Sequence, residues 1–253
     1  MDRGSYIAAS GGVLQMRKLE VQNNNIANIN TVGFKKQFVT AESQSFQNTF
    51  ASLLGTRAPF AKPDHDRTPG VENLQVRTDF SQGPIRNTGN PFDVALRNAN
   101  DFFVLGTPQG PMYTRAGDFT LSASNELVTQ DGVSVSGDGG PIQINGTRAA
   151  IEPSGTIRVN GLPVGKLQVV KIDDPSKLER VAGTRFKLGA GAAQPQPVEA
   201  QVVPQSLEMS NVSPISSMVD LIVTNRAFEA YTKVSQTIDQ MNQSSITQVG
   251  RRQ

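Results

Sequence analysis

The side chains that most often carry chemistry are few and scattered in this sequence. His65 is the only histidine, it lies between Asp64 and Asp66, and the chain contains no cysteine. Metal centres in proteins recruit several His, Cys or carboxylate ligands from different segments, so one imidazole in a polar loop is a poor candidate. We therefore expect a solvated loop at His65 and no metal site.

Two other segments have the composition of a phosphate-binding or catalytic site. Gly137–Gly140 is rich in glycine, but no Lys-Ser/Thr pair and no helix start follow it, which favours a hairpin turn. Asp93 follows Pro91–Phe92 at an expected strand start, where a carboxylate commonly stabilises a turn. A Ser-His-Asp relay has no plausible geometry with a single loop histidine. The sequence thus predicts no catalytic residue, no cofactor and no small-molecule substrate.

The bulk composition excludes further classes of function. The 253 residues carry a net charge of only +2, which gives little attraction for nucleic acid or anionic lipid. No apolar run reaches the ~18 residues that a membrane span needs. The first residues, 1–6, lack the pattern of a cleaved signal peptide. The lack of cysteine suits a reducing cytoplasm, and equally an exported protein that must stay unlinked.

The two ends of the chain carry helical apolar spacing, over residues 5–30 and 212–247. Ile7, Leu14 and Val21 are seven residues apart, a spacing typical of a helix that packs on another helix. Ordering backbone costs ~1–2 kcal/mol per residue, and an isolated helix covers little of its apolar stripe. We expect these helices to become ordered mainly against each other and against other subunits. A simple antiparallel hairpin on the central domain is the alternative.

Helix ends are indicated at both termini. Ser213–Pro214 predicts an N-cap followed by the first helical residue of the C-terminal helix. Gly33 suits a left-handed position after the N-terminal helix. Before Gly33, Asn24 and Asn28 share one helix face, and buried amides can fix the register between packed helices. A frayed, solvated end rich in asparagine would explain the same residues.

The middle of the chain, residues 81–172, shows short strands separated by glycine turns. Residues 102–105 form a buried-strand pattern, 106–110 a turn, and 165–172 another strand. This density of turns is typical of a small antiparallel barrel or sandwich. The expected fold class is α+β: long N- and C-terminal helices packing as a coiled-coil-like pair, with a central antiparallel β barrel or sandwich domain. The expected segments are a helix over 1–35, an irregular or extended connection over 36–80, the β domain over 81–188, a linker over 189–206 and a helix over 207–253.

Segments along most of the chain resemble, in the same order, the motifs of bacterial flagellar rod and hook proteins. The matching segments are 24–35, 88–96, 101–104, 113–119, 207–212 and 218–229. The opening residues 1–11 and the modest length are most similar to the proximal-rod members, with distal-rod and hook-type members as the alternative. Asn23, Ser216–Ser217 and 97–100 depart from the family pattern, which affects fine contacts only.

The resemblance implies a structural subunit rather than an enzyme, assembling head-to-tail into a helical tube that transmits torque. It implies that the partners are copies of itself, other flagellar rod proteins and the flagellar type III export apparatus. It also implies a location in the periplasmic rod of the basal body, reached without a cleaved signal. A self-contained β-sheet binding module with a helical stalk is a less favoured reading, and a hydrolase lacks the necessary residues. The expected assembly residues are Asn24, Asn25, Asn28, Asn30, Gly33, Phe34, Leu207, Glu208, Asn211, Val212, Arg226 and Phe228.

Overall fold

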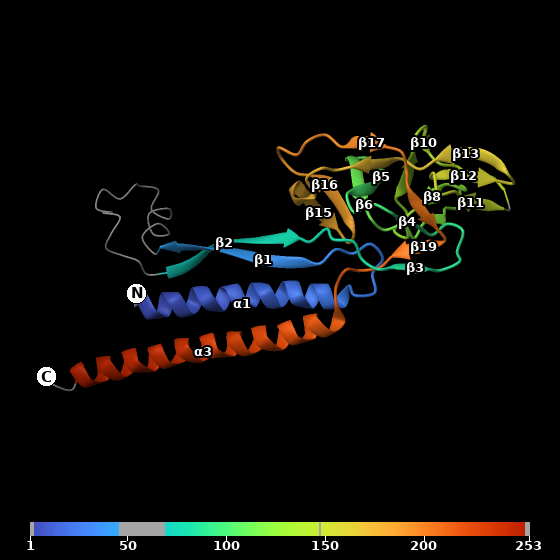
Figure 1. The fold of residues 1–253 in the computed structure, drawn as a ribbon. Coiled ribbons are helices and arrows are strands. Elements are labelled where there is room, and N and C mark those ends of the chain that lie inside the picture. Colours follow the sequence, from blue (N-terminus) through green and yellow to red (C-terminus); the bar gives the residue numbers. More distant parts are fainter. Residues whose placement is uncertain (1–2, 46–68, 147, 251–253) are drawn as a thin grey trace. The chain divides into compact units, whose positions relative to one another are not determined.

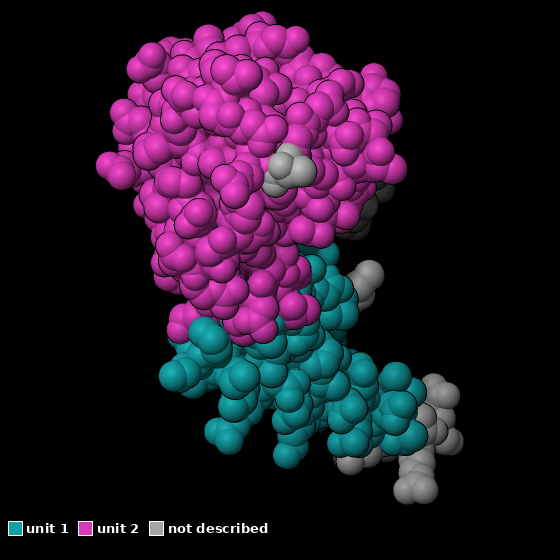
Figure 2. All heavy atoms as spheres, turned by 90° about the vertical axis from the view of Figure 1, so that its right-hand side faces the viewer, with its two compact units in different colours: residues 1–26, 37–77, 214–253 teal, residues 27–36, 78–213 magenta. Residues whose placement is uncertain are grey.

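The chain forms two compact units, which are coloured separately in Figure 2. A computed structural model describes residues 3–45, 69–146 and 148–250. Unit 1 consists of residues 1–26, 37–77 and 214–253, and unit 2 consists of residues 27–36 and 78–213. Each unit is therefore assembled from segments that lie far apart in the sequence.

In its described residues, unit 1 contains two long helices and a two-stranded antiparallel ribbon (Figure 1). Its elements are α1 (Arg3–Ala27), β1 (Gln37–Ser45), β2 (Pro69–Thr78) and α3 (Pro214–Gly250). The helices run antiparallel, because Gln22 near the end of α1 bonds Thr224 early in α3, whereas Gly11 near the start of α1 faces Tyr231. Proline at the first position of α3 suits a helix start, where its missing N–H has no helical partner, as Ser213–Pro214 predicts.

Unit 2 is built from short strands and one 3₁₀ turn. The first part of it contains β3 (Ile85–Asn87), β4 (Val94–Leu96), β5 (Asp101–Thr107), β6 (Gly110–Thr114), β7 (Thr120–Leu121), β8 (Leu127–Val128), β9 (Ser134–Gly137) and β10 (Gly140–Pro141). The second part contains β11 (Ala149–Ile151), β12 (Thr156–Val159), β13 (Leu162–Lys166), β14 (Val169–Lys171), η1 (Pro175–Lys177), β15 (Leu178–Ala182), β16 (Arg185–Leu188), β17 (Gln196–Val198), β18 (Val202–Pro204) and β19 (Ser206–Glu208).

The strands of unit 2 pair antiparallel, and β5 lies at the centre. The main sheet runs in the order β15-β16-β6-β5-β9-β8-β7, and β14 pairs with both β5 and β17. Three late strands return to earlier ones: β17 pairs with β14, β18 with β4 and β19 with β3. Side chains on the two faces of β5 enter two apolar clusters, with Phe103 and Leu105 in one and Phe102 and Val104 in the other. Alternation along a strand explains this division.

The coarse fold class is confirmed: a helix near each end of the chain and a large antiparallel β-rich region between them. Several element boundaries differ from the expectation. The linker expected over 189–206 contains β17 and β18, whereas the described part of 36–80, expected to be irregular or extended, forms the paired strands β1 and β2. The strand expected over 165–172 is two strands, because β13 pairs with β12 whereas β14 pairs with β5 and β17.

Two further observations concern the kinds of site that were not expected. None of the helices in the described part of the chain is both long enough and apolar enough to cross a bilayer. Within residues 3–45, 69–146 and 148–250, no three His, Cys, Asp or Glu side chains are grouped as metal ligands. His65 lies outside the described residues.

Candidate assembly site

A buried ion cluster lies inside unit 2 and joins three distant parts of the sequence. The Glu208 carboxylate accepts from Lys35 Nζ at 2.7 Å through Oε1 and from Arg115 Nη2 at 2.5 Å through Oε2. All three side chains are at most 1% exposed. We call Lys35, Arg115 and Glu208 the Glu208 cluster. Two cations share one anion here, so a net positive charge is buried.

The remaining donors of the cluster are satisfied by backbone carbonyls. Arg115 Nη1 donates to the carbonyl oxygens of Asn98 and Asp101, both at 2.6 Å. Lys35 Nζ also donates to the carbonyl of Ser81 at 2.6 Å. Burial lowers the pKa of Lys35 below its ordinary value, and the neighbouring Glu208 carboxylate opposes this shift. A buried charge is tolerable only when it is paired and hydrogen-bonded in this way.

Backbone contacts hold the segment after α1 against the segment before α3. Gly33 N–H donates to the carbonyl of Glu208 at 2.8 Å, and Lys36 N–H donates to Asn211 Oδ1 at 2.7 Å. Gly33 has φ of 66°, and a Cβ there would lie 2.3 Å from the backbone nitrogen of Ala116. Glycine is required by both its conformation and its close packing. It lies beyond the end of α1, in the turn that follows.

Two further residues from the expected set tie this region together. The Asn211 side chain donates through Nδ2 to the carbonyls of Asp79 and Ser81. The Phe34 ring is buried under the guanidinium of Arg180, and the guanidinium carbon Cζ lies 4.5 Å from the ring centroid. Burial lowers the pKa of Arg180 to about 10. Cation–π contact and a hydrogen bond to the Lys35 carbonyl hold this cation in place.

The end of α1 is fixed by a reciprocal amide contact within unit 1. Asn25 is buried, its Nδ2 donates to the Gln37 carbonyl at 2.7 Å, and its Oδ1 accepts from the Gln37 N–H at 2.9 Å. An amide that donates and accepts towards one residue defines where β1 starts relative to α1. Asn28 Oδ1 accepts from the Thr31 hydroxyl in the following turn, which belongs to unit 2.

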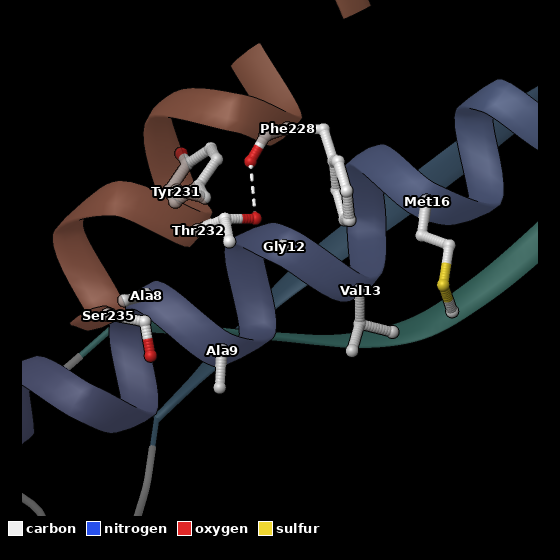
Figure 3. Close-up of a pocket in the computed structure, with 9 residues that line it drawn as sticks. All are labelled: Ala8, Ala9, Gly12, Val13, Met16, Phe228, Tyr231, Thr232 and Ser235. Carbon is white, nitrogen blue, oxygen red and sulfur yellow. Dashed lines mark hydrogen bonds between the residues drawn. The ribbon is translucent and has the colours of Figure 1, made fainter. Parts of the chain in front are cut away.

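The facing sides of α1 and α3 combine small and polar residues with the aromatic ring of Tyr231, which lies against Gly11. Gln22 Nε2 donates to the Thr224 hydroxyl at 3.0 Å, and Ser217 and Thr224 are buried. A shallow groove of about 250 Å³ lies along the pair, shown in Figure 3. Its lining residues are Ala8, Ala9, Gly12, Val13, Met16, Phe228, Tyr231, Thr232 and Ser235.

Both helices also expose large apolar residues. On α3 these are between 49% and 79% exposed, namely Ile215, Met218, Val219, Ile222, Val223, Val234, Met241 and Ile246. On α1, Ile7, Val13 and Met16 are exposed as well. Among the described side chains of unit 1, the buried apolar ones are Ala8, Val21 and Ile238. The usual polarity of a surface helix is thus inverted on α3.

The expected assembly residues fall into two groups in the structure, apart from Asn25, which is buried in unit 1. Gly33, Phe34, Leu207, Glu208, Asn211 and Val212 lie in unit 2 and make or adjoin contacts within it, and all except Asn211 are buried. Asn24, Asn30 and Arg226 are exposed, and Asn28 and Phe228 are half-buried. For all twelve residues, a role in contacts between subunits stays a prediction.

Sequence reasoning missed four residues that organise these contacts. Lys35 and Arg115 lie within the motif segments 24–35 and 113–119. The sequence could have indicated both, because each is the one basic residue of its motif segment. Gln22 and Thr224 gave no such signal, because a single polar residue in a long helix is ordinary. Their pairing is visible only after the helices are placed side by side.

Models of three flagellar families match successive parts of the chain. The flagellar basal body rod protein family matches residues 6–35, and the D1 domain of the flagellar hook proteins FlgE/F/G matches residues 98–159. The C-terminal family of flagellar basal body rod FlgEFG proteins matches residues 203–249. The first and last matches include α1 and α3, and the middle match covers the central strands of unit 2.

Curated relatives are similar over almost the whole length. The chain is 31% identical to the flagellar basal-body rod protein FlgF of Caulobacter vibrioides over 99% of both chains. It is 33% identical to FlgF of Rhizobium meliloti over 92% of this chain and 91% of the relative. It is 32% identical to the rod protein FlgG of C. vibrioides over 94% of this chain and 96% of the relative. The chain therefore belongs to the family of flagellar basal-body rod proteins.

Proposed function

We propose that this protein is a structural subunit of the flagellar rod, most similar to the proximal-rod members. The observation that carries the proposal is the apolar surface left open on α1 and α3, most of it on α3. Soluble monomers rarely expose contiguous apolar surface without an interaction to cover it. In a structural role, torque would pass through packed side chains without chemical turnover.

The finer geometry of assembly follows from this proposal. Head-to-tail contacts that do not close on themselves generate a helical tube. The helices of neighbouring subunits would pack in a coiled-coil-like manner around the tube axis, with the β-rich unit, as a barrel or sandwich, forming the outer wall. The partners would be copies of this chain and other rod proteins. Export through the flagellar type III apparatus would bring the chain to the periplasmic rod.

The expected assembly residues would act in two ways. Asn24, Asn30 and Arg226 are exposed and Asn28 and Phe228 are half-buried, and these five residues would contact neighbouring subunits. The buried set around Glu208 would act indirectly, because it fixes where the segments leading to both helices leave unit 2. An altered buried residue would then damage assembly by misplacing those segments.

The test places a charge on the open face of α3 in the full-length protein. Ile222→Asp should abolish swimming and incorporation into isolated basal bodies, because the carboxylate would have to be buried between subunits. The matched control, Ile222→Leu, keeps the face apolar and should retain motility. Thermal unfolding of the purified variants should match that of the unmodified protein. Normal swimming of cells that carry Ile222→Asp would contradict the proposal.

A distal-rod or hook-type position is the alternative, favoured by the similarity to FlgG. Crosslinking in isolated basal bodies distinguishes the two positions. A photo-crosslinker at exposed Val219 should capture only rod subunits of the membrane-proximal part if the proximal assignment holds. Capture of hook subunits would move the chain to the distal end of the axis and leave its structural role intact.

A further inference from the structure

The Glu208 cluster brings together residues that become available at very different times as the chain is made. Lys35 and Arg115 come early in the sequence, whereas Glu208, their shared carboxylate, comes late. Synthesis runs from the N-terminus, so both cations precede their anion. Without Glu208, closure of unit 2 would bury two positive charges that lack a counter-ion. Such burial is strongly unfavourable.

The strands on either side of Glu208 add to the same dependence. β18 pairs with β4 and β19 with β3, so two early strands lack a partner until residues 202–208 arrive. Ala200 and Val202 fill part of the larger apolar cluster, and Val202 pairs with Leu96 of the early strand β4. The incomplete chain therefore lacks a carboxylate, two strand partners and part of a core at once.

We infer that Glu208 is a closing residue: unit 2 stays open until the segment 200–208 is present, and then closes around the shared carboxylate. Glu208 is a positioning residue, because its carboxylate holds Lys35 and Arg115 together and its carbonyl binds Gly33. The backbone bond from Gly33 N–H to the Glu208 carbonyl forms in the same step. The inference concerns the folding of this chain and is independent of its place in a flagellum.

The first experiment separates the charge of Glu208 from its shape, in full-length protein. Glu208→Gln keeps the shape and leaves two buried cations, so the unfolding equilibrium constant of unit 2 should rise at least ~100-fold. Lys35→Met leaves a neutral Arg115–Glu208 pair, so the rise should stay below ~10-fold. The double variant has one buried cation and should fall between the two single variants.

This series remains decisive if Glu208→Gln does not fold. A folded double variant would then show that the unpaired Lys35 charge was the cause. A double variant as unstable as Glu208→Gln would overturn the inference, because shape rather than charge would be decisive. An unchanged stability of Glu208→Gln would overturn it as well.

The second experiment tests the order of closure during synthesis of the full chain. Samples taken from synchronised translation are treated briefly with protease, and fragments of unit 2 are identified by mass. Resistant unit 2 should appear only in chains that extend beyond residue 208. Resistant unit 2 in chains that end before residue 200 would contradict the inference.

Discussion

Unit 2 and unit 1 cover their apolar residues to very different extents. In unit 2, strands and loops enclose two apolar clusters and the Glu208 cluster, and Phe102, Phe103 and Glu208 are fully buried. In unit 1, two long helices contact each other through small, polar and aromatic residues and leave many large apolar side chains exposed. The contrast predicts that unit 2 folds without partners, whereas unit 1 completes its packing against other molecules.

The largest expected effect tests whether unit 2 is self-sufficient. Phe103→Ala removes a buried ring that packs edge-on against Phe119, with centroids 5.2 Å apart. A cavity of this kind costs ~3–5 kcal/mol. Chemical denaturation of the purified variant should show this loss. A loss below ~1 kcal/mol would mean that the core of unit 2 is loosely packed.

A second prediction concerns the contact between α1 and α3, and it uses two adjacent glycines. A Cβ on Gly11 would lie 2.4 Å from Tyr231 Cε1, whereas the nearest atom to a Cβ on Gly12 is 4.0 Å away. Gly12→Ala should strengthen α1 by ~1 kcal/mol through helix propensity. Gly11→Ala should forfeit that gain and lose ~1–3 kcal/mol of packing.

Hydrogen exchange of the α1 amides in the full-length variants measures this difference. Slower exchange in Gly12→Ala and faster exchange in Gly11→Ala are expected. Equal exchange in both variants would show that the helices are not held at this distance in solution.

The location of the helices, the antiparallel class of the middle and the start of α3 followed from the sequence alone. Apolar spacing, turn dipeptides and the Ser213–Pro214 pair are local signals, and they place elements well. The contacts between elements did not follow, because Gln22 and Thr224 are 202 residues apart and neither is unusual where it stands. The prediction of a single strand over 165–172 was wrong for the same reason. The segment forms two strands because β13 pairs with β12 whereas β14 pairs with β5.

The Glu208 cluster marks the limit of sequence reasoning at the candidate site. Glu208 was expected to act at the assembly interface because of its motif, and the structure places it inside unit 2. A motif shows that a residue matters but not which surface it serves. The two cations that pair with Glu208 come from motifs that are far apart, so nothing in the order of residues joins them.

A smaller effect concerns the stability of unit 2 at acidic pH. Burial, followed by the charges of Asp93 and Asp131, raises the pKa of Asp118 above its ordinary value. The folded state then holds this proton more tightly than the unfolded state. The contribution of Asp118 is therefore greatest below pH 3.8 and is lost as the pH rises through the folded-state pKa.

Asp118→Asn should remove this loss of stability with rising pH, and it should slightly stabilise unit 2 at neutral pH. Denaturation midpoints of the two proteins between pH 3.5 and pH 7, in steps of about half a unit, check this expectation. Parallel curves for the two proteins would contradict the assignment of the pH dependence to Asp118.

The smallest effect on stability is expected on the open face of α3. Met218 is 54% exposed, so Met218→Ala should change the stability of the purified protein by no more than ~0.5 kcal/mol. The same variant should weaken assembly, since the side chain is covered only there. Competition with unmodified protein for incorporation into basal bodies measures this loss, and equal incorporation would show that Met218 faces solvent in the rod.

Hydrogen exchange of the purified, dilute, full-length subunit tests the central claim most directly. Amides of β5 and β14 in unit 2 should be strongly protected, and those of α1 and α3 should exchange much faster. In isolated basal bodies the helices should gain protection that approaches that of β5. Equal protection of α3 and β5 in the dilute subunit would contradict the account, because the helices would then need no other molecule to complete their packing.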